Sequence, residues 1–239
     1  MTANQEDLSL AGLRRVLRRL AKPGKAKGLQ GFFKTGPGEY AEGDQFIGVM
    51  VRESRAIARR YRELPLREVT QLLRSPWHEE RLVALFILVD QFQRGSATKQ
   101  QAIYELYLRS TPCVNNWDLV DSSAAYIVGP WLARHSRTVL LRLARSRSLW
   151  ERRIAIVATH YFIRRHDYRD TLRITKMLLG DGHHLIHKAC GWMLREVGQR
   201  DVAVLERFLQ RYASRMPRTM LRYAIEKFSA PRRRLYLRM

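Results

Sequence analysis

Apolar residues recur along most of this chain with the period of an α-helix. The pattern begins near Phe46 and continues almost to the C-terminus, with short interruptions rich in Gly, Pro or Ser. No stretch alternates apolar and polar residues in the way that would predict a strand. We therefore expect an all-α protein, with helices near residues 46–62, 65–74, 77–93, 97–109, 115–128, 130–145, 149–165, 168–179, 184–197, 200–213 and 217–228.

The N-terminal part of the chain has a different pattern. Leucines at helical spacing over residues 10–20, with arginines between them, predict a basic amphipathic helix that ends at Pro23. Residues 24–45 are rich in glycine, and we expect a loop there whose Lys34 and Tyr40 can reach a phosphate backbone or groove. No Gly-Lys-Ser or Gly-Lys-Thr follows, so a nucleotide-binding P-loop is not predicted.

Three segments of the helical region resemble one another. Leu72-Leu73-Arg74-Ser75 stands just before Glu80-Arg81-Leu82, and Leu143-Ala144-Arg145-Ser146 stands just before Glu151-Arg152-Arg153, 71 residues later. A similar segment begins at Leu178, a further 35 residues on. Pairs of helices that repeat at about this spacing are typical of HEAT-like repeats. We expect a HEAT-like helical-repeat solenoid, an α-α superhelix.

The repeat brings distant residues into register. Steps of 35 or 36 residues give two series, Leu82, Trp117, Arg153 and Lys188, and, one turn later, Phe86, Asp121, Val157 and Trp192. In a stacked solenoid, equivalent positions lie side by side, and the second helix of each pair usually lines the concave face. We therefore expect two tryptophans, one aspartate and two cations to share one concave patch.

Charge indicates what such a face would bind. Lysine and arginine number 44 against 22 acidic residues, so the formal net charge is +22 and the pI is about 10.9. This excess predicts a polyanionic partner and a basic concave face. The basic residues are spread through many amphipathic segments beside 5 Trp and 10 Tyr, which favours nucleic acid over a membrane surface.

Other features of the sequence limit the class of protein. Cys113 and Cys190 are the only cysteines, too few for a disulfide framework or a cysteine-based zinc site, and a reducing cytoplasm fits them. No run of eighteen apolar residues predicts a membrane span. His183 and His187 have a spacing seen in zinc sites, but no acid stands at a suitable third position, so we predict no metal.

Two motifs connect the chain with a known family. Asn-Trp-Asp-Leu-Val-Asp over 116–121 and Gly-Trp-Met-Leu-Arg-Glu over 191–196, with 34–40 and 150–155, resemble the DNA alkylation repair family, the AlkD-like HEAT-repeat DNA glycosylases. The resemblance covers about residues 30–230. We accordingly divide the chain into a basic N-terminal helix and linker (1–28), a repeat glycosylase domain (29–230) and a basic tail (231–239).

The resemblance implies an activity and a set of site residues. The activity is hydrolysis of the N-glycosidic bond of purines alkylated at N3 or N7 in duplex DNA, by a monofunctional, cofactor-free and monomeric enzyme of the bacterial cytoplasm and nucleoid. Asp121 matches the catalytic carboxylate and Arg153 the site arginine, with Arg152 as the alternative if the register slips by one. The site tryptophans match Trp117 and Trp192. Further DNA contacts are expected from Lys34, Tyr40, Arg152, Lys188 and Arg195.

The chemistry of these side chains is compatible with that activity. A purine alkylated at N3 or N7 is already a cationic leaving group, so its departure needs no strong general acid. Positive charge then develops on the sugar, where a carboxylate such as Asp121 can stabilise it and hold the attacking water. Indoles stabilise nearby cationic character, and an arginine can hold the adjacent phosphate.

Three other interpretations remain open from the sequence. Trp117 can be a core residue and Asp121 a solvated charge, because aromatic and acidic neighbours are common on helices. A noncatalytic HEAT-repeat protein that recognises distorted or branched DNA would explain the charge equally well, although an acid in a basic groove weakens phosphate binding. A protein-interaction scaffold is compatible with the fold but disfavoured by the net charge of +22.

Overall fold

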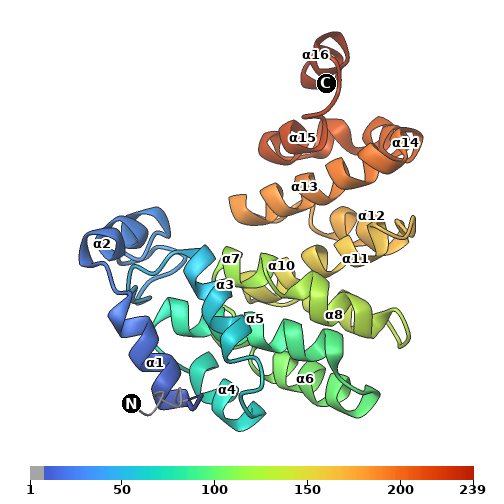
Figure 1. Ribbon diagram of the computed structural model, residues 1–239. Coiled ribbons are helices and arrows are strands. Elements are labelled where there is room, and N and C mark those ends of the chain that lie inside the picture. The colour runs from blue at the N-terminus through green and yellow to red at the C-terminus, as the bar shows by residue number, and fades with distance from the viewer. Residues whose placement is uncertain (1–7) are drawn as a thin grey trace, which may run out of the picture. The chain divides into compact units, whose positions relative to one another are not determined.

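The structure, a computed structural model, describes residues 8–239, whose regular elements are helices apart from one isolated bridge, between Gln45 and Trp77 (Figure 1). The predicted all-α helical-repeat fold is confirmed. The chain forms two compact units, Met1–Ser123 and Ala124–Met239. Residues 1–7 of the predicted N-terminal segment lie outside the described part. None of the described helices is long and apolar enough to cross a membrane.

The first unit is built around α5 (His78–Arg94), which packs against α3, α4 and α6. The side chains of Leu82 through Leu88 are all buried, so this helix forms the centre of the core. The other elements are α1 (Leu10–Arg19), α2 (Pro23–Phe32), α3 (Val51–Arg60), α4 (Leu66–Leu73), α6 (Ala97–Arg109), a 3₁₀ turn (Thr111–Cys113) and α7 (Trp117–Asp121).

The second unit has two central helices. The helix α10 (Leu149–Ala158) packs against α8, α9 and α13, and α13 (His184–Arg200) packs against α14 and α15. The remaining elements are α8 (Ala124–Leu132), α9 (Thr138–Ala144), α11 (His160–Ile163), α12 (Arg169–Met177), α14 (Val202–Tyr212), a 3₁₀ turn (Ala213–Arg215), α15 (Arg218–Ala224) and α16 (Ala230–Leu237). The last helix covers most of the residues expected to form a tail, and its Tyr236 is buried.

The prediction of a loop over 24–45 is wrong for its first part. The helix expected over 10–20 is present as α1 and ends before Pro23. Pro23 then begins a second helix, α2, because proline at the first helical position has a suitable φ and loses no hydrogen bond there. No residue of α2 itself is buried. The helix delivers Phe33, only 7% exposed, into the core of the first unit.

Three expected helices are each divided in two, and one of them, 130–145, is interrupted over residues 133–137 between α8 and α9. The expected helix 115–128 breaks at Ser122–Ser123, where the Ser123 hydroxyl donates to the carbonyl of Leu119 at 2.6 Å. The expected helix 149–165 breaks at Thr159, whose hydroxyl donates to the carbonyl of Ile156 at 2.6 Å. Hydroxyl groups that bond to carbonyls of the preceding turn compete with the helical backbone, and sequence periodicity does not reveal this.

The predicted repeat register holds for three of its four positions. Leu82, Arg153 and Lys188 are each the fifth residue of a helix, in α5, α10 and α13. Trp117 is instead the first residue of α7, so the register slips at this repeat. The slip places the indole at a helix start rather than one turn inside the helix.

Candidate active site

Helix α7 carries two of the predicted site residues, Trp117 at its start and Asp121 at its end. Asn116 is fully buried and caps the helix, since its side-chain oxygen accepts from the backbone N–H of Trp117 at 2.8 Å. The helix is only five residues long. A helix this short has little stability of its own, so contacts from its side chains must fix it in place.

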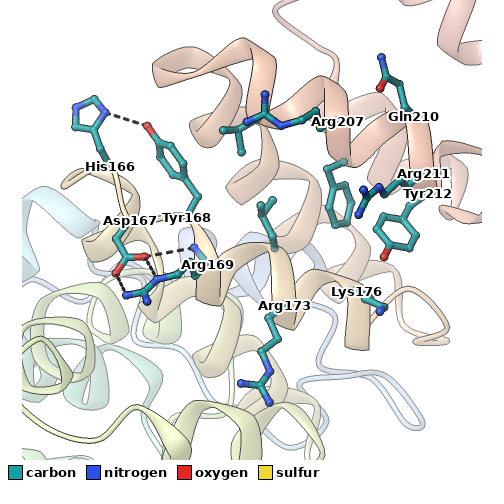
Figure 2. Close-up of a pocket in the computed structure, with 13 residues that line it drawn as sticks. His166, Asp167, Tyr168, Arg169, Arg173, Lys176, Arg207, Gln210, Arg211 and Tyr212 are labelled. Atoms are coloured by element: carbon teal, nitrogen blue, oxygen red, sulfur yellow. Dashed lines mark hydrogen bonds and ion pairs between the residues drawn. The ribbon is translucent and has the colours of Figure 1, made fainter.

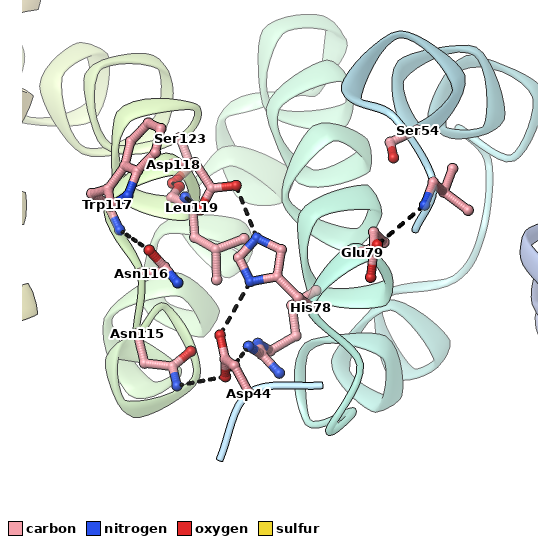
Figure 3. Close-up of polar contacts among 12 residues, drawn as sticks. Asp44, Ser54, His78, Glu79, Asn115, Asn116, Trp117, Asp118, Leu119 and Ser123 are labelled. Atoms are coloured by element: carbon pink, nitrogen blue, oxygen red, sulfur yellow. Dashed lines mark hydrogen bonds and ion pairs between the residues drawn. The ribbon is translucent and has the colours of Figure 1, made fainter. Parts of the chain in front are cut away.

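A buried polar network provides that fixation (Figure 3). The His78 ring, 2% exposed, bonds through Nε2 to Asp118 in the first turn of α7 at 2.8 Å and through Nδ1 to Asp44 at 3.1 Å. Asp44 also accepts from Arg81 at 2.6 Å and from Asn115 at 3.3 Å. The start of α7 is therefore connected to α5 and to the segment around residue 44.

The network sets the charge of its histidine. Burial alone would lower the pKa of His78, but attraction and hydrogen bonding by Asp118, together with the hydrogen bond to Asp44, outweigh burial and raise the pKa to about 9. Burial raises the pKa of the Asp44 carboxyl, but His78 and Arg81 more than compensate, so that pKa lies below its usual range. His78 is thus a buried cation at neutral pH and donates from both ring nitrogens to carboxylates.

Aromatic rings form a second connection to α7. The Trp117 ring stacks on Phe33 with centroids 5.3 Å apart, and Phe32 meets the same indole edge to face at 6.0 Å. Phe33 stacks in turn on Phe46 at 5.1 Å, and Phe46 stacks on the His78 imidazole at 4.5 Å. One side of the half-buried indole is therefore set by α2, a helix that the sequence did not predict.

Glu79 fixes the extended segment that follows residue 45. Its buried carboxylate accepts the backbone N–H groups of Ile47, Gly48 and Val49 at 2.9, 2.8 and 3.2 Å. Gly48 has a φ of +88°, and a Cβ there would lie 2.3 Å from the carbonyl oxygen of Lys22. The position requires glycine for both reasons, and the segment holds Phe46 against His78.

Asp121 lies at the end of α7, and its side chain is half-buried. Its negative charge acts on Tyr107, whose pKa is raised first by burial and further by the charge of Asp121. The Tyr107 hydroxyl bonds to Ser123 at 2.9 Å, immediately beyond the helix. Polar contacts therefore hold the chain at both ends of α7, the helix that carries Asp121.

The predicted site arginine belongs to the second unit. Arg153 in α10 is 5% exposed and donates from Nη1 to the carbonyl of Leu185 in α13 at 2.6 Å. Its neighbour Arg152 pairs with Asp181 at 2.6 Å and also donates to the carbonyls of Ser146 and Arg147. Arg153 therefore connects α10 to the first turn of α13. Arg152 connects α10 to the turn before α13 and to the turn before α10 itself.

Trp192 in α13 has its orientation set by a neighbour one turn along the helix. Its indole Nε1 donates to Glu196 at 3.3 Å, and Glu196 also pairs with Arg200 at 3.0 Å. The ring of His160 is tilted against the indole with centroids 5.8 Å apart. Burial, which outweighs attraction by Glu196, lowers the pKa of His160, so this ring is neutral at pH 7.

The remaining predicted DNA contacts are dispersed over both units. Lys34 is exposed, has a φ of +58° and approaches Glu39 at 4.0 Å, and Tyr40 is half-buried in the following turn. Lys188 is half-buried one turn before Trp192 in α13. Arg195 pairs with Glu226. The Arg195 Nε–H is buried and has no hydrogen-bond partner among the described residues.

The histidines considered for zinc have structural contacts. His183 caps α13 by accepting from the backbone N–H of Leu185 at 3.2 Å, and His187 bonds to the carbonyl of Asp181. Within residues 8–239 no three metal-binding side chains are grouped closely enough to hold an ion.

Sequence reasoning missed the residues that hold α7. His78, Asp118 and Asp44 stand far apart in the chain, and none has a helical or repeat spacing to the others. One signal was present, since Asp118 is a second carboxylate within the Asn-Trp-Asp-Leu-Val-Asp motif and none of the predicted roles uses it. Phe33 gave no signal, because it follows a segment interpreted as a loop.

The two units differ greatly in charge. Residues 124–239 contain 25 Lys and Arg against 8 Asp and Glu, a net charge of +17, whereas residues 1–123 contain 19 against 14, a net charge of +5. Most of the capacity to attract a polyanion therefore belongs to the second unit. The candidate carboxylate Asp121 belongs to the first.

Comparison with known proteins identifies the family. A family model described as DNA alkylation repair enzyme matches residues 13–228. Among solved structures, a predicted DNA alkylation repair enzyme from Enterococcus faecalis is similar, with a TM-score of 0.67, 18% identity, and coverage of 88% of this chain and 97% of that one. No curated protein matches. The chain therefore belongs to the DNA alkylation repair enzyme family, which assigns it a role in the repair of alkylation damage to DNA.

Proposed function

We propose that the protein is a monofunctional DNA glycosylase that removes purines alkylated at N3 or N7 from duplex DNA. The observation that supports this most strongly is the construction of α7. A five-residue helix carries Trp117 and Asp121, and buried contacts of His78 and Tyr107 hold its two ends. A carboxylate and an indole fixed in this way can stabilise charge that develops only in the transition state.

The reaction would proceed by loss of the base followed by attack of water. The alkylated purine departs as a neutral base, because it already carries a positive charge, and the sugar becomes an oxocarbenium-like cation. Asp121 stabilises that cation and orients the water that attacks the anomeric carbon. Trp117 contributes its indole face to the cationic sugar, for about 0.5–2 kcal/mol where water is excluded.

The second unit would bind the DNA backbone. Arg153 is the candidate for the phosphate beside the lesion, and Trp192 is the candidate for the second indole at the sugar. Glu196 fixes the Trp192 indole through Nε1, which supports a positioned rather than a mobile ring.

The direct test is release of free base from methylated duplex DNA. We expect the protein to liberate 7-methylguanine and 3-methyladenine and to leave abasic strands that break only after treatment with alkali. Because the proposed mechanism uses water as the nucleophile, borohydride should trap no protein–DNA adduct. An adduct that disappears in Lys188→Gln would instead show a Schiff-base mechanism with that lysine.

A noncatalytic DNA-binding protein of the same family is the second candidate. The net charge of +17 in the second unit favours it, since strong phosphate binding needs no catalytic carboxylate. Tight and salt-sensitive binding of duplex DNA without release of any alkylated base would favour this candidate over the glycosylase.

A further inference from the structure

A cavity of 1010 Å³ lies between α12 and α14 in the second unit, lined by neither α7, α10 nor α13 (Figure 2). Its apolar part is formed by Leu172, Val204 and Phe208, and Tyr168 and Tyr212 stand at its sides. This size is at the upper end for pockets that enclose a small ligand and is far too small to enclose a DNA duplex.

The walls of the cavity are strongly basic. Exposed cations project from both helices, namely Arg169, Arg173 and Lys176 from α12, and Arg207 and Arg211 from α14. Their spacings of three and four residues place the cations of each helix on one face, so that two basic rows border the cavity.

Three of these arginines have no ion-pair partner in the described part of the chain. Among residues 8–239, no acidic group pairs with Arg173, Arg207 or Arg211. Asp167 is the only acid among the described lining residues, and it pairs with Arg137 at 2.7 Å and with Arg169 at 3.2 Å. The hydrogen bonds from Arg169 and Arg137 outweigh burial and lower the pKa of Asp167 to about 2, so its charge is already neutralised within the protein.

Aromatic side chains accompany these cations. Tyr212 packs against Phe208 with centroids 4.8 Å apart, and Lys176 Nζ lies 5.9 Å from the Tyr212 ring centre. At the other end of the cavity the Tyr168 hydroxyl bonds to His166 at 2.9 Å. Basic rows combined with aromatic rings are the features with which proteins bind an unpaired nucleic-acid strand, whose phosphates meet the cations and whose bases stack on the rings.

We propose that this cavity, the α12–α14 groove, is a second nucleic-acid site that binds a short single-stranded segment. Phosphates of the strand contact Arg173, Arg207 and Arg211, and a base stacks on Tyr212. An acidic peptide would also meet the cations but would leave the tyrosine rings without a stacking partner. The site does not require the excision chemistry proposed above.

The test uses a fluorescein-labelled oligothymidylate of about 12 nucleotides. Its binding is followed by fluorescence anisotropy in the presence of saturating unlabelled duplex, which fills any duplex interface. We expect the wild type to bind the strand under these conditions. A triple variant with Arg173→Gln, Arg207→Gln and Arg211→Gln should bind at least tenfold more weakly, and its slope of log K against log salt should be shallower by about 2.

A second triple variant with Arg142→Gln, Arg215→Gln and Arg234→Gln controls for net charge, because these exposed arginines of the same unit lie outside the groove. It should keep both the affinity within about threefold and the salt slope. Excision of alkylated purines from duplex DNA should be unchanged in both variants. Equal losses of strand affinity in the two variants, or complete displacement of the strand by duplex, would overturn the proposal.

Tyr212→Leu distinguishes a nucleic-acid strand from other polyanions. It should weaken strand binding about five- to tenfold and leave the affinity for inorganic polyphosphate unchanged, because only the strand has bases to stack. A thermal melt establishes that the variant is folded. Equal affinity of wild type and Tyr212→Leu for the strand, or displacement of the strand by oligoglutamate at equal charge concentration, would contradict a nucleic-acid site and indicate an acidic protein partner.

Discussion

The His78 imidazole and the Asp118 carboxylate form a buried ion pair at 2.8 Å that ties α5 to the first turn of α7. Asp118 is three residues from the proposed catalytic carboxylate and belongs to the same five-residue helix. The pair thus holds the helix that positions Asp121, although neither His78 nor Asp118 is proposed to contact the substrate. The contribution of this ion pair to stability can be measured separately from catalysis.

Stability should depend on pH through His78. The folded-state pKa of about 9 lies above the ordinary value of 6.5, so the stabilisation is fully present below pH 6.5 and is lost as the pH rises through 9. The loss should be on the order of 3 kcal/mol. Chemical denaturation at several pH values should show this decline in the wild type and not in His78→Gln, whereas His135→Gln, at an exposed position, should keep it. A decline that persists in His78→Gln would contradict the assignment of this pH dependence to His78.

Loss of the Asp118 carboxylate should reduce excision through the position of α7. Asp118→Asn keeps the size of the side chain but removes the ion pair, and breaking a buried pair typically costs about 3–5 kcal/mol of stability. We expect single-turnover excision to fall about tenfold in protein that is still folded, with little change in duplex affinity. An unchanged excision rate in a variant with a lowered Tm would show that α7 needs no fixation by His78.

The glycine of the Gly-Trp-Met-Leu-Arg-Glu motif should be required for packing rather than chemistry. A Cβ at Gly191 would lie 2.5 Å from the carbonyl oxygen of Met220 and 2.5 Å from Cβ of Tyr223. Gly191→Ala should therefore force α13 and α15 apart and destabilise the protein by about 1–3 kcal/mol. Gly182→Ala, which has open space around it, should change stability by less than about 0.5 kcal/mol. Equal Tm values for the two variants would contradict this packing.

The two indoles should act together if both units bind the same nucleotide. Trp117→Phe and Trp192→Phe are each expected to slow excision, and a double-mutant cycle measures whether their effects are independent. Residues that act on one transition state should show a coupling energy of at least about 0.5–1 kcal/mol. Additivity within about 0.3 kcal/mol would mean that the two tryptophans do not serve one reacting nucleotide.

The fold was predictable because the core follows helical periodicity. The helix α5 required only the spacing of apolar residues, and the repeats at Leu82, Arg153 and Lys188 followed from the similarity of three segments. Periodicity failed where a local hydrogen bond competed with the helix, at Ser123 and Thr159, and where composition misled, in α2. Glycine-rich composition suggested a loop there. The chain forms a helix instead, because proline suits the helix start at residue 23 and burial of Phe33 anchors the helix end.

The candidate site was only partly predictable for a related reason. Trp117, Asp121, Arg153 and Trp192 are recognisable because motif and repeat positions select them. The groups that hold them act through tertiary contacts between segments remote in sequence, such as His78 with Asp44 and Asp118. The groove between α12 and α14 could not be predicted, because its arginines and its lysine are ordinary exposed residues in the sequence and form two facing rows only when the helices pack.

The most direct test of the central claim is single-turnover excision of 7-methylguanine from duplex DNA by Asp121→Asn. The substitution preserves shape and removes the negative charge that should stabilise the cationic sugar. We expect the rate to fall about 10²–10³-fold while the Kd for duplex stays within about threefold, as electrostatic stabilisation of a transition state predicts. Asp90→Asn, which removes a charge paired with Arg94 on α5, should have the wild-type rate. Wild-type excision by Asp121→Asn would contradict the assignment of this carboxylate.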